Sequence, residues 1–331
     1  MDANPTTNAQ GTKRWPGVFR QRPRKNLGLF SVASAGRPSS VSVVTSIGGN
    51  VDGMSKLDVM TLFVDRAFSA RLELAEADHL AGAAETYGAM APEAAPTLLR
   101  VGGGVAAFFA PNIQISRAVG LGMRGAVSAA ELDGLEAFYR GRAPAVRILV
   151  SAHADPTLYA LLGARGFRLV ELDTVLVRAI GPAERFADAA AVTRLARDDE
   201  AAAWVRTSLS GFSDRDEPPP PGGHAPIYER LFTMPSVTYL FGLVDGVARA
   251  SAAVDVQRST AHLFATSTMP VARRRGLQGA LIEARLALAQ QAGCDLAFLH
   301  TAAGSPSQRN AERHGFRPVA SRASMIKPFA P

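Results

Sequence analysis

The most informative segment of this 331-residue chain reads Thr268-Met269-Pro270-Val271-Ala272-Arg273-Arg274-Arg275-Gly276-Leu277-Gln278-Gly279-Ala280-Leu281. The residues before it predict a strand, and the apolar spacing after Gly276 predicts a helix of about 16 residues. A helix start exposes unpaired N–H groups and the positive end of the helix dipole. Gly276 lets a bulky anion approach the backbone, and three arginines add positive charge. The segment therefore predicts a phosphate-binding site.

Charge alone leaves an alternative open, because an arginine-rich, solvated turn before an ordinary helix has the same composition. A Walker loop is excluded, since no Gly-Lys-Ser/Thr follows the glycines. The net charge of +7 comes almost entirely from residues 1–50, which hold seven basic residues against Asp2. The remaining residues are nearly neutral, so they lack the general positive charge that nucleic-acid binding needs.

Working outward, the chain alternates predicted strands and helices, which indicates an α/β fold. Downstream, we expect a helix over 277–292, a strand over 295–300, a helix over 306–313 and a strand over 316–326. Upstream, we expect a strand at 191–195, helices at 199–209 and 227–232, and strands at 237–244, 247–256 and 261–268.

The first half of the chain repeats this order. We expect a helix over 57–90, strands at 97–101, 105–109 and 113–121, a helix at 129–140, a strand at 146–151, a helix at 156–165 and a strand at 167–177. Arg165-Gly166-Phe167-Arg168-Leu169-Val170 matches His314-Gly315-Phe316-Arg317-Pro318-Val319 at an offset of 149 residues. A period this long indicates duplicated domains.

The dipeptide Gly181-Pro182 breaks both helices and strands, so we place the domain boundary there. The prediction is a first domain over 54–181 and a second over 182–331. Residues 1–53 are rich in Gly, Pro and Ser with no apolar period, which predicts a disordered basic tail.

The segment around Gly276 resembles the pyrophosphate loop of the GNAT superfamily of N-acetyltransferases, which reads Gln/Arg-x-x-Gly-x-Gly/Ala. Arg273-x-x-Gly276 matches that pattern, and Pro270 lies six residues before Gly276, as in the family. The His314-Gly315-Phe316 ending of the last helix is also similar. The resemblance covers residues 190–327 strongly and residues 57–180 as a diverged copy, as in tandem members of the superfamily.

This resemblance implies acetyl-CoA as the co-substrate, no metal, and an amine that attacks the acetyl carbon directly. Backbone N–H groups of 274–279 would hold the pyrophosphate, and the backbone of 265–268 would pair with the pantetheine arm and polarise the thioester carbonyl. The implied cofactor-binding residues are Ala265, Thr266, Ser267, Thr268, Arg273, Arg274, Arg275, Gly276, Leu277, Gln278, Gly279 and Asn310.

The chain departs from the family pattern at three positions. Gln278 stands where Gly or Ala is usual, so its side chain must turn aside or bind the cofactor. Ala311 stands where a Tyr often protonates the leaving thiolate, and Gly304 stands where an Asn often contacts pantetheine. Ser307, one turn before Ala311, could replace the acid. An unassisted CoA thiolate is the alternative, because an ordinary thiol has a pKa of about 8.5.

The general base has a weaker signal. Asp214, Asp216, Glu217 and His224 lie in a loop that the resemblance places beside the acceptor. An exposed polar loop is the preferred interpretation of these residues, and a proton relayed through water would need none of them.

Three other signals are interpreted as structural. The glycine spacing of a Rossmann loop occurs in Gly120-Leu121-Gly122-Met123-Arg124-Gly125, but no acidic residue follows about 20 residues later. By the 149-residue offset, this segment is equivalent to the arginine-rich segment before Gly276, so we interpret it as a degenerate phosphate loop that no longer binds CoA. Cys294 is interpreted as a small buried residue. The histidines at 79, 153, 262 and 300 have no metal-ligand spacing in the sequence.

The sequence therefore predicts two GNAT-like domains with a mixed sheet, the second catalytic, which acetylate a small-molecule or peptide amine. A non-catalytic acyl-CoA-binding module of the same fold is the alternative. We expect no nucleic-acid or membrane partner and a cytoplasmic location, because no apolar run reaches the roughly 18 residues of a membrane span. Oligomeric state, acceptor identity and the identities of the acid and base stay open.

Overall fold

The computed structural model describes residues 64–90, 97–217 and 223–329. The predicted basic tail over 1–53 lies outside these residues, as does the start of the first predicted helix. Among the described helices, none combines the length and the apolar character needed to cross a membrane.

The described part of the first half follows the predicted order of elements. Its elements are α1 (Arg66–Met90), β1 (Leu98–Val101), β2 (Gly104–Ala107), β3 (Ala118–Val119), α2 (Ala129–Tyr139), β4 (Ala145–Ser151), α3 (Pro156–Ala164) and β5 (Arg168–Ala179). Asp65 begins α1 by accepting a 2.7 Å hydrogen bond from the Phe68 N–H.

The second half repeats this order with longer strands. Its elements are β6 (Thr193–Leu195), α4 (Ala201–Phe212), α5 (Ala225–Leu231), β7 (Val237–Val244), β8 (Val247–Gln257), β9 (Thr260–Thr268), α6 (Leu277–Gln291), β10 (Leu296–Ala302), α7 (Pro306–Arg313) and β11 (Arg317–Pro328). One-turn 3₁₀ segments precede α4 and follow β9.

One predicted strand is much shorter than expected. The sequence predicts a strand over 113–121, but only Ala118 and Val119 pair as β3. The Ser116 hydroxyl explains the difference, because it accepts from the N–H groups of Phe109 and Ala110 and donates to the Ala110 carbonyl. These bonds hold the preceding residues in a loop instead of a ladder.

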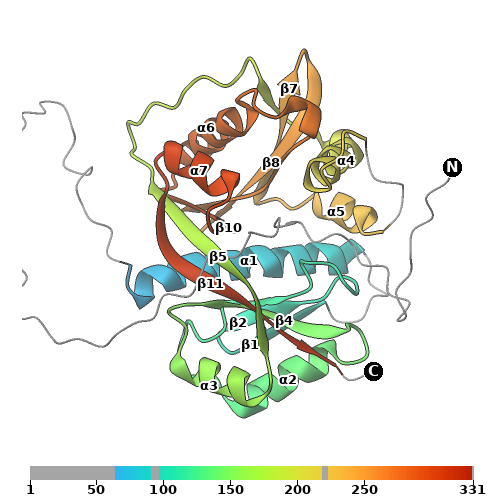
Figure 1. Ribbon diagram of the computed structural model, residues 1–331, viewed down its shortest axis with the longest axis vertical. Helices are drawn as coiled ribbons and strands as arrows, with labels where there is room; N and C mark the ends of the chain where they lie inside the picture. Colours follow the sequence, from blue (N-terminus) through green and yellow to red (C-terminus); the bar gives the residue numbers. More distant parts are fainter. Residues whose placement is uncertain (1–63, 91–96, 218–222, 330–331) are drawn as a thin grey trace, which may run out of the picture. The chain divides into compact units, whose positions relative to one another are not determined.

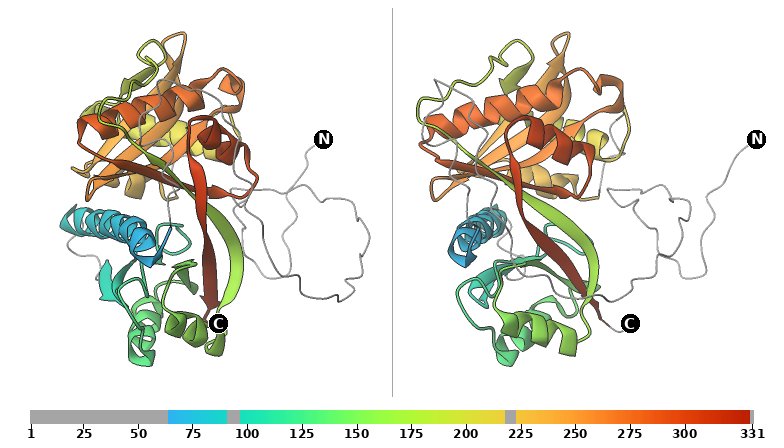
Figure 2. Two further views of the ribbon diagram at one scale, coloured as in Figure 1. Left: turned by 90° about the vertical axis from the view of Figure 1, so that its left-hand side faces the viewer. Right: turned by 60° about the vertical axis from the view of Figure 1, so that its left-hand side comes forward.

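All described strands join one sheet of eleven strands, in the order β1-β2-β3-β4-β11-β5-β10-β9-β8-β7-β6. Each half therefore gives its last strand to the other half. β11 pairs with β4 of the first half, and β5 pairs with β10 of the second half (Figures 1 and 2). The two exchanged strands also pair with each other along their length.

The two exchanged strands, β5 and β11, are related by pseudo-twofold symmetry. Where β5 and β11 pair, Asp173 lies opposite Arg322, and these residues are 149 positions apart, the same offset as the repeat in the sequence. Each is thus the counterpart of the other, and the two halves are related by a pseudo-twofold axis between these strands.

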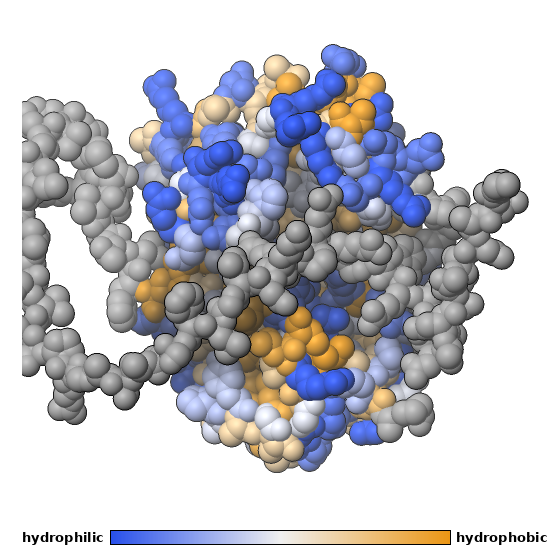
Figure 3. Space-filling model, in the orientation of Figure 1, coloured by the Kyte–Doolittle hydropathy of each residue, from blue (hydrophilic) through white to orange (hydrophobic). Residues whose placement is uncertain are grey.

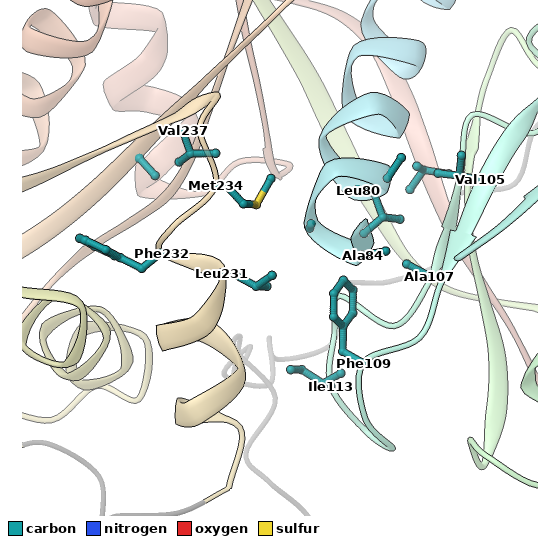
Figure 4. Packing of buried hydrophobic residues seen from close by; sticks show 14 of the residues in the cluster. Leu80, Ala84, Val105, Ala107, Phe109, Ile113, Leu231, Phe232, Met234 and Val237 are labelled. Carbon is teal, nitrogen blue, oxygen red and sulfur yellow. The ribbon is translucent and has the colours of Figure 1, made fainter. Parts of the chain in front are cut away.

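The helices divide between the two faces of the sheet. In the second half, α6 and α7 cover one face with a core that includes Leu281 and Phe316. On the other face, α1, α4 and α5 share a core that also takes in β2 of the first half. Leu80 of α1, Val105 of β2 and Leu231 of α5 meet there (Figure 4). Helix α1 therefore packs against both halves.

Hydrophobic residues gather near the middle of the face shown in Figure 3, the region that β5 and β11 cross in Figure 1. On β5, the side chains of Leu169, Val170 and Leu172 are each about half exposed. This part of β5 extends beyond the end of β10, so its outer edge has no register partner there.

Candidate functional site

The predicted phosphate loop connects β9 to α6, and its backbone has an unusual shape. Arg274 has a φ of 63° and Gly276 a φ of 79°, so two residues near the helix start are left-handed. No side chain caps α6, and its first turn has no acidic residue. Among the described residues, no acceptor bonds the N–H groups of 274–279. The N-terminal end of α6, which we call its mouth, can therefore bind an anion through these N–H groups.

Arg273 has a different environment from the other two arginines. Its guanidinium donates to the carbonyls of Thr268 at 3.2 Å and Gly211 at 3.3 Å, and it forms an ion pair with Asp214. Arg273 thus fastens the end of α4 to the end of β9. Arg274 and Arg275 are exposed and have no ion pair with a described residue.

The acidic residues proposed as bases are mostly engaged elsewhere. Asp214 pairs with Arg273, and the Asp216 carboxylate accepts the Val271 N–H at 2.7 Å. His224 donates to the Pro111 carbonyl at 3.1 Å, and Glu217 is exposed. Asp214 and Asp216 therefore lie beside the phosphate loop, and the structure brings none of these groups to the centre of the sheet.

Strands β9 and β10 separate where the resemblance places the pantetheine arm. They are parallel and in register from Thr260 to His262 on β9, and beyond His262 neither strand has a partner on the other. On its other side, β9 has a bulge: Ala253 of β8 lies opposite Phe264, but Ser251 lies opposite Ser267. The extra residue falls at 265–266, and Ala265 has a φ of 49°.

Ala265 and Thr266 consequently have no register partner on either neighbouring strand. Their backbone groups lie where β9 has left β10, which is the geometry that adding a strand-like ligand requires. Ser267 differs, because its buried hydroxyl donates to the Ser208 carbonyl at 3.0 Å. Its side chain therefore joins β9 to α4.

Gln278 turns its side chain toward α7 rather than along the loop. Its amide nitrogen donates to the Ser307 hydroxyl at 3.3 Å, and its amide oxygen accepts from Asn310. Three residues selected separately in the sequence thus form one polar group between α6 and α7. Ser307 lies one turn from the buried Ala311, as expected.

Gly279 has a packing role that the sequence did not reveal. A Cβ at this position would lie 2.8 Å from His314 Nε2, so a larger residue would displace the imidazole that packs here at the end of α7. His314 is held there by Glu283 of α6. A role of the Gly279 N–H in binding phosphate remains a prediction.

The corresponding helix start in the first half is closed by the chain itself. The Glu131 carboxylate accepts the Ser128 N–H at 2.8 Å, which completes a capping box, and it also accepts the Gly102 N–H at 3.1 Å. The Val127 N–H donates to the Thr157 hydroxyl. The hydrogen bonds from Ser128 and Gly102 hold the pKa of the Glu131 carboxyl below its usual value. A negative group therefore already occupies the mouth of α2.

A buried charged cluster lies under α1 at the centre of the sheet. Glu76 of α1 forms ion pairs with Arg322 of β11 and with Arg117, the latter at 2.8 Å. His300 of β10 lies 3.6 Å from the same carboxylate. Burial raises the pKa of Glu73, one turn earlier, to about 7. Four elements that are distant in sequence thus supply one network.

Within the described residues, Glu76, His262 and His300 bring three ligand atoms within 4.8 Å of one another. The sequence spacing did not reveal this group, because its acid comes from α1 and its histidines from β9 and β10. The donor set fits a metal ion poorly, since two guanidiniums already bind the carboxylate and would repel a cation. Cys294 is buried, as expected.

No protein-family model matches the chain, and no curated protein matches its sequence. Among solved structures, a GCN5-related N-acetyltransferase from Kribbella flavida matches with a TM-score of 0.52 and 17% identity, over 79% of this chain and 96% of that chain. A tandem GNAT protein from the clavulanic acid biosynthesis pathway matches with a TM-score of 0.49 and 14% identity, over 80% and 95%.

A GCN5-related N-acetyltransferase from Sphaerobacter thermophilus matches with a TM-score of 0.42 and 14% identity, over 56% of this chain and 60% of that chain. At these sequence identities, the similarity shows a shared fold only. The Kribbella flavida structure shares this fold over almost the whole of its own chain. The mixed α/β sheet and the repeated order of elements were both expected. The chain has the fold of the GNAT N-acetyltransferases, as the resemblance in its sequence predicts.

Proposed function

We propose that the second half of this chain transfers an acetyl group from acetyl-CoA to an amine. The pyrophosphate binds the open N–H groups of 274–279, with Arg274 and Arg275 beside it. The pantetheine arm adds to the edge of β9 where that strand separates from β10. The thioester carbonyl lies at the bulge of Ala265 and Thr266, whose backbone N–H groups polarise it.

In the reaction, the lone pair of the neutral amine forms a bond to the thioester carbon. The carbonyl π electrons move to oxygen, and this charge is stabilised at the bulge. When the C=O bond re-forms, the C–S bond breaks and CoA leaves as the thiolate. The amine nitrogen loses one proton, and the thiolate gains one from Ser307 or from water, which gives an amide and CoA thiol.

The observation that carries this proposal is the contrast between two equivalent helix starts. The start of α6 has unpaired N–H groups and no acid in its first turn, and the nearby Asp214 is neutralised by Arg273, whereas the start of α2 contains the Glu131 carboxylate. A pyrophosphate suits the first and is repelled by the second. We therefore assign the cofactor to the second half alone.

A second candidate is a module that binds acyl-CoA without turnover. Ala311 favours it, because this position has a methyl group where the family often has a Tyr, and the nearby Ser307 already bonds Gln278. Such a module would have the same phosphate loop and the same bulge. It would lack only a group that protonates the leaving thiolate.

The test is release of CoA thiol from acetyl-CoA by the purified full chain, against aminoglycosides, amino acids, polyamines and peptides with free N-termini. We expect release with at least one amine, together with an acetylated product in the mass spectrum. Calorimetry with CoA is run in parallel. Binding without release on any amine would favour the module, and absence of CoA binding would refute both candidates.

A further inference from the structure

Arg285 is the largest fully buried side chain among the described residues, and it lies on the face of α6 that covers the sheet. Its side chain is 1% exposed. No described carboxylate forms an ion pair with it, and burial lowers its pKa to about 9. The guanidinium is therefore charged at neutral pH, and no described acid neutralises it. Burying an unpaired charge is unfavourable unless hydrogen bonds or a function compensate for it.

The guanidinium bonds the backbone at the bulge of β9. Its Nη1 donates to the Ala253 carbonyl of β8 at 3.2 Å and to the Phe264 carbonyl of β9 at 3.4 Å. Its Nε donates to the Leu281 carbonyl of its own helix at 2.9 Å. Ala253 and Phe264 are register partners, and the extra residue of the bulge follows directly. Arg285 thus joins three elements at that point.

The first half has the opposite charge at the equivalent position. Glu136 lies 149 residues before Arg285, on α2, and it is also buried. Unlike Arg285, it is neutralised, by Arg165 at 3.2 Å and Lys327 at 2.8 Å. The half with the closed helix mouth therefore has a paired acid here, and the half with the open mouth has an unpaired cation.

We propose that Arg285 is the positioning residue of the acyl-transfer site: it holds the bulge of β9 so that the backbone at Ala265–Thr266 faces the separation from β10, and its charge stabilises the thioester oxygen as that oxygen becomes negative. This inference rests on the proposed function. Arg285 acts through the bulge and touches neither substrate.

The test uses full-length Arg285→Met and Arg285→Lys with Leu286→Ala as the matched control. Leu286 is the next residue of α6 and is equally buried, but it packs in the apolar core and bonds nothing at the bulge. All three variants lose stability, so loss of activity alone would not distinguish positioning from packing. The discriminating readout is the infrared carbonyl band of carbonyl-¹³C acetyl-CoA bound to each protein.

In the wild type, we expect this band to lie below its frequency in water, because the bulge and the charge behind it polarise the carbonyl. Arg285→Met should abolish the shift and reduce kcat by ~10²-fold with an unchanged KM for acetyl-CoA. Arg285→Lys should restore part of both, and Leu286→Ala should keep the full shift. A full shift in Arg285→Met would overturn the inference.

A second measurement keeps the inference separate from the proposed function. Hydrogen exchange of the ligand-free proteins reports on residues 263–268 directly. We expect these amides to exchange at least tenfold faster in Arg285→Met than in Leu286→Ala. Equal exchange would refute positioning even if the wild type transfers acetyl groups. Faster exchange in a protein that releases no thiol would refute the proposed function and leave the structural role of Arg285 intact.

Discussion

At the scale of single residues, neighbours of the same type have different surroundings. Arg273 is bonded to Thr268, Gly211 and Asp214, whereas Arg274 and Arg275 extend into solvent beside the open N–H groups. At long range, the three positive charges add to one electrostatic potential. Binding a phosphate requires a free guanidinium, and only the last two provide one.

We predict that the double variant Arg274→Glu/Arg275→Glu weakens CoA binding by about 10–100-fold, because two repulsive charges replace two attractive ones beside a dianion. Calorimetry with CoA measures this. Arg124→Glu, in the equivalent loop of the first half, is the matched control and should bind CoA as the wild type does. Equal weakening by the control would mean that the first loop also binds the cofactor.

His262 gives a prediction about acid stability. Burial lowers its pKa to about 3, and its ring stacks on Phe298 at 4.5 Å. A free histidine has a pKa of about 6.5, so the unfolded chain binds the proton first as the pH falls. The contribution of His262 to stability is therefore constant above about pH 6.5 and decreases from there toward pH 3, by roughly 5 kcal/mol when complete.

His262→Phe keeps the stacking and removes the proton. Urea unfolding at pH 7 and pH 4 should show a smaller difference in the free energy of unfolding than in the wild type. His300, whose pKa burial also lowers, retains part of the pH dependence. His224→Gln serves as control, because His224 lies outside the buried cluster and bonds only the Pro111 carbonyl. An unchanged pH difference in His262→Phe would contradict this account.

At the scale of elements, the contacts between helices and strands fix the shape of the site. Gly211, near the end of α4, packs directly on the end of β9. A Cβ there would lie 2.8 Å from the Ser267 Cβ and 2.9 Å from the Thr268 backbone nitrogen. No larger residue leaves both elements in place, and β9 at this point is the proposed pantetheine edge.

We therefore predict that Gly211→Ala lowers the free energy of unfolding by about 1–3 kcal/mol and weakens CoA binding, because α4 must move away from β9. Denaturant unfolding and calorimetry measure the two effects. Gly163→Ala is the control, since a Cβ there meets nothing within 4 Å and the residue is also in a helix. Similar losses in both variants would remove the steric explanation.

The mouth of α2 yields a second prediction at this scale. Glu131→Gln removes a carboxylate that accepts three hydrogen bonds from Ser128 and Gly102. We expect a loss of about 1 kcal/mol in unfolding free energy at pH 7. The loss should shrink as the pH falls from the unfolded pKa toward the lower folded pKa, because a carboxyl whose folded pKa is lowered contributes its full stability only above its unfolded pKa. Unfolding at pH 7 and pH 3 tests this, and an equal loss at both would contradict it.

At the scale of the whole molecule, the exchange of β5 and β11 makes each half part of the other's sheet. The predicted boundary at Gly181-Pro182 stays a prediction, and it cuts the chain just after β5, a strand that pairs with β10 and β11 of the other half. Residues 182–331 alone would leave β10 without β5 and β11 without β4. Such exposed edges favour aggregation.

We predict that residues 54–181 and 182–331 are each insoluble or oligomeric when expressed alone, and that co-expression gives a one-to-one complex. Size-exclusion chromatography of a tagged fragment, with the co-purified partner identified by mass, measures this. Two separately folded monomers would show that the exchange is not required for folding of the halves.

Much of the architecture was accessible from local sequence patterns. The segment around Gly276 predicted a strand, an anion-binding turn and a helix, and the 149-residue repeat predicted two related halves. The strand, the turn and the helix depend on residues close together in the chain, and the repeat follows from comparing two segments of the same sequence.

The sequence pattern of a single element was less informative where side-chain hydrogen bonds determine whether a segment becomes a strand or a loop. The predicted strand over 113–121 is mostly loop, because the Ser116 hydroxyl takes the backbone bonds that a ladder would use. The order of the strands is also invisible in the repeat. Antiparallel β5 and β11 have equivalent sequences, so each half could have kept its own last strand.

The sequence by itself therefore determined most of the elements, the repeated order of the two halves and the open turn before α6, because periodicity, turn residues and self-similarity can all be read along the chain. Only the tertiary structure decided that Arg273 is bonded to α4, that Glu131 closes the first helix mouth, and that Arg285 lies unpaired behind the bulge of β9. The reason is physical: a charged side chain acts according to the groups within a few ångströms of it, and folding brings those groups from distant parts of the chain.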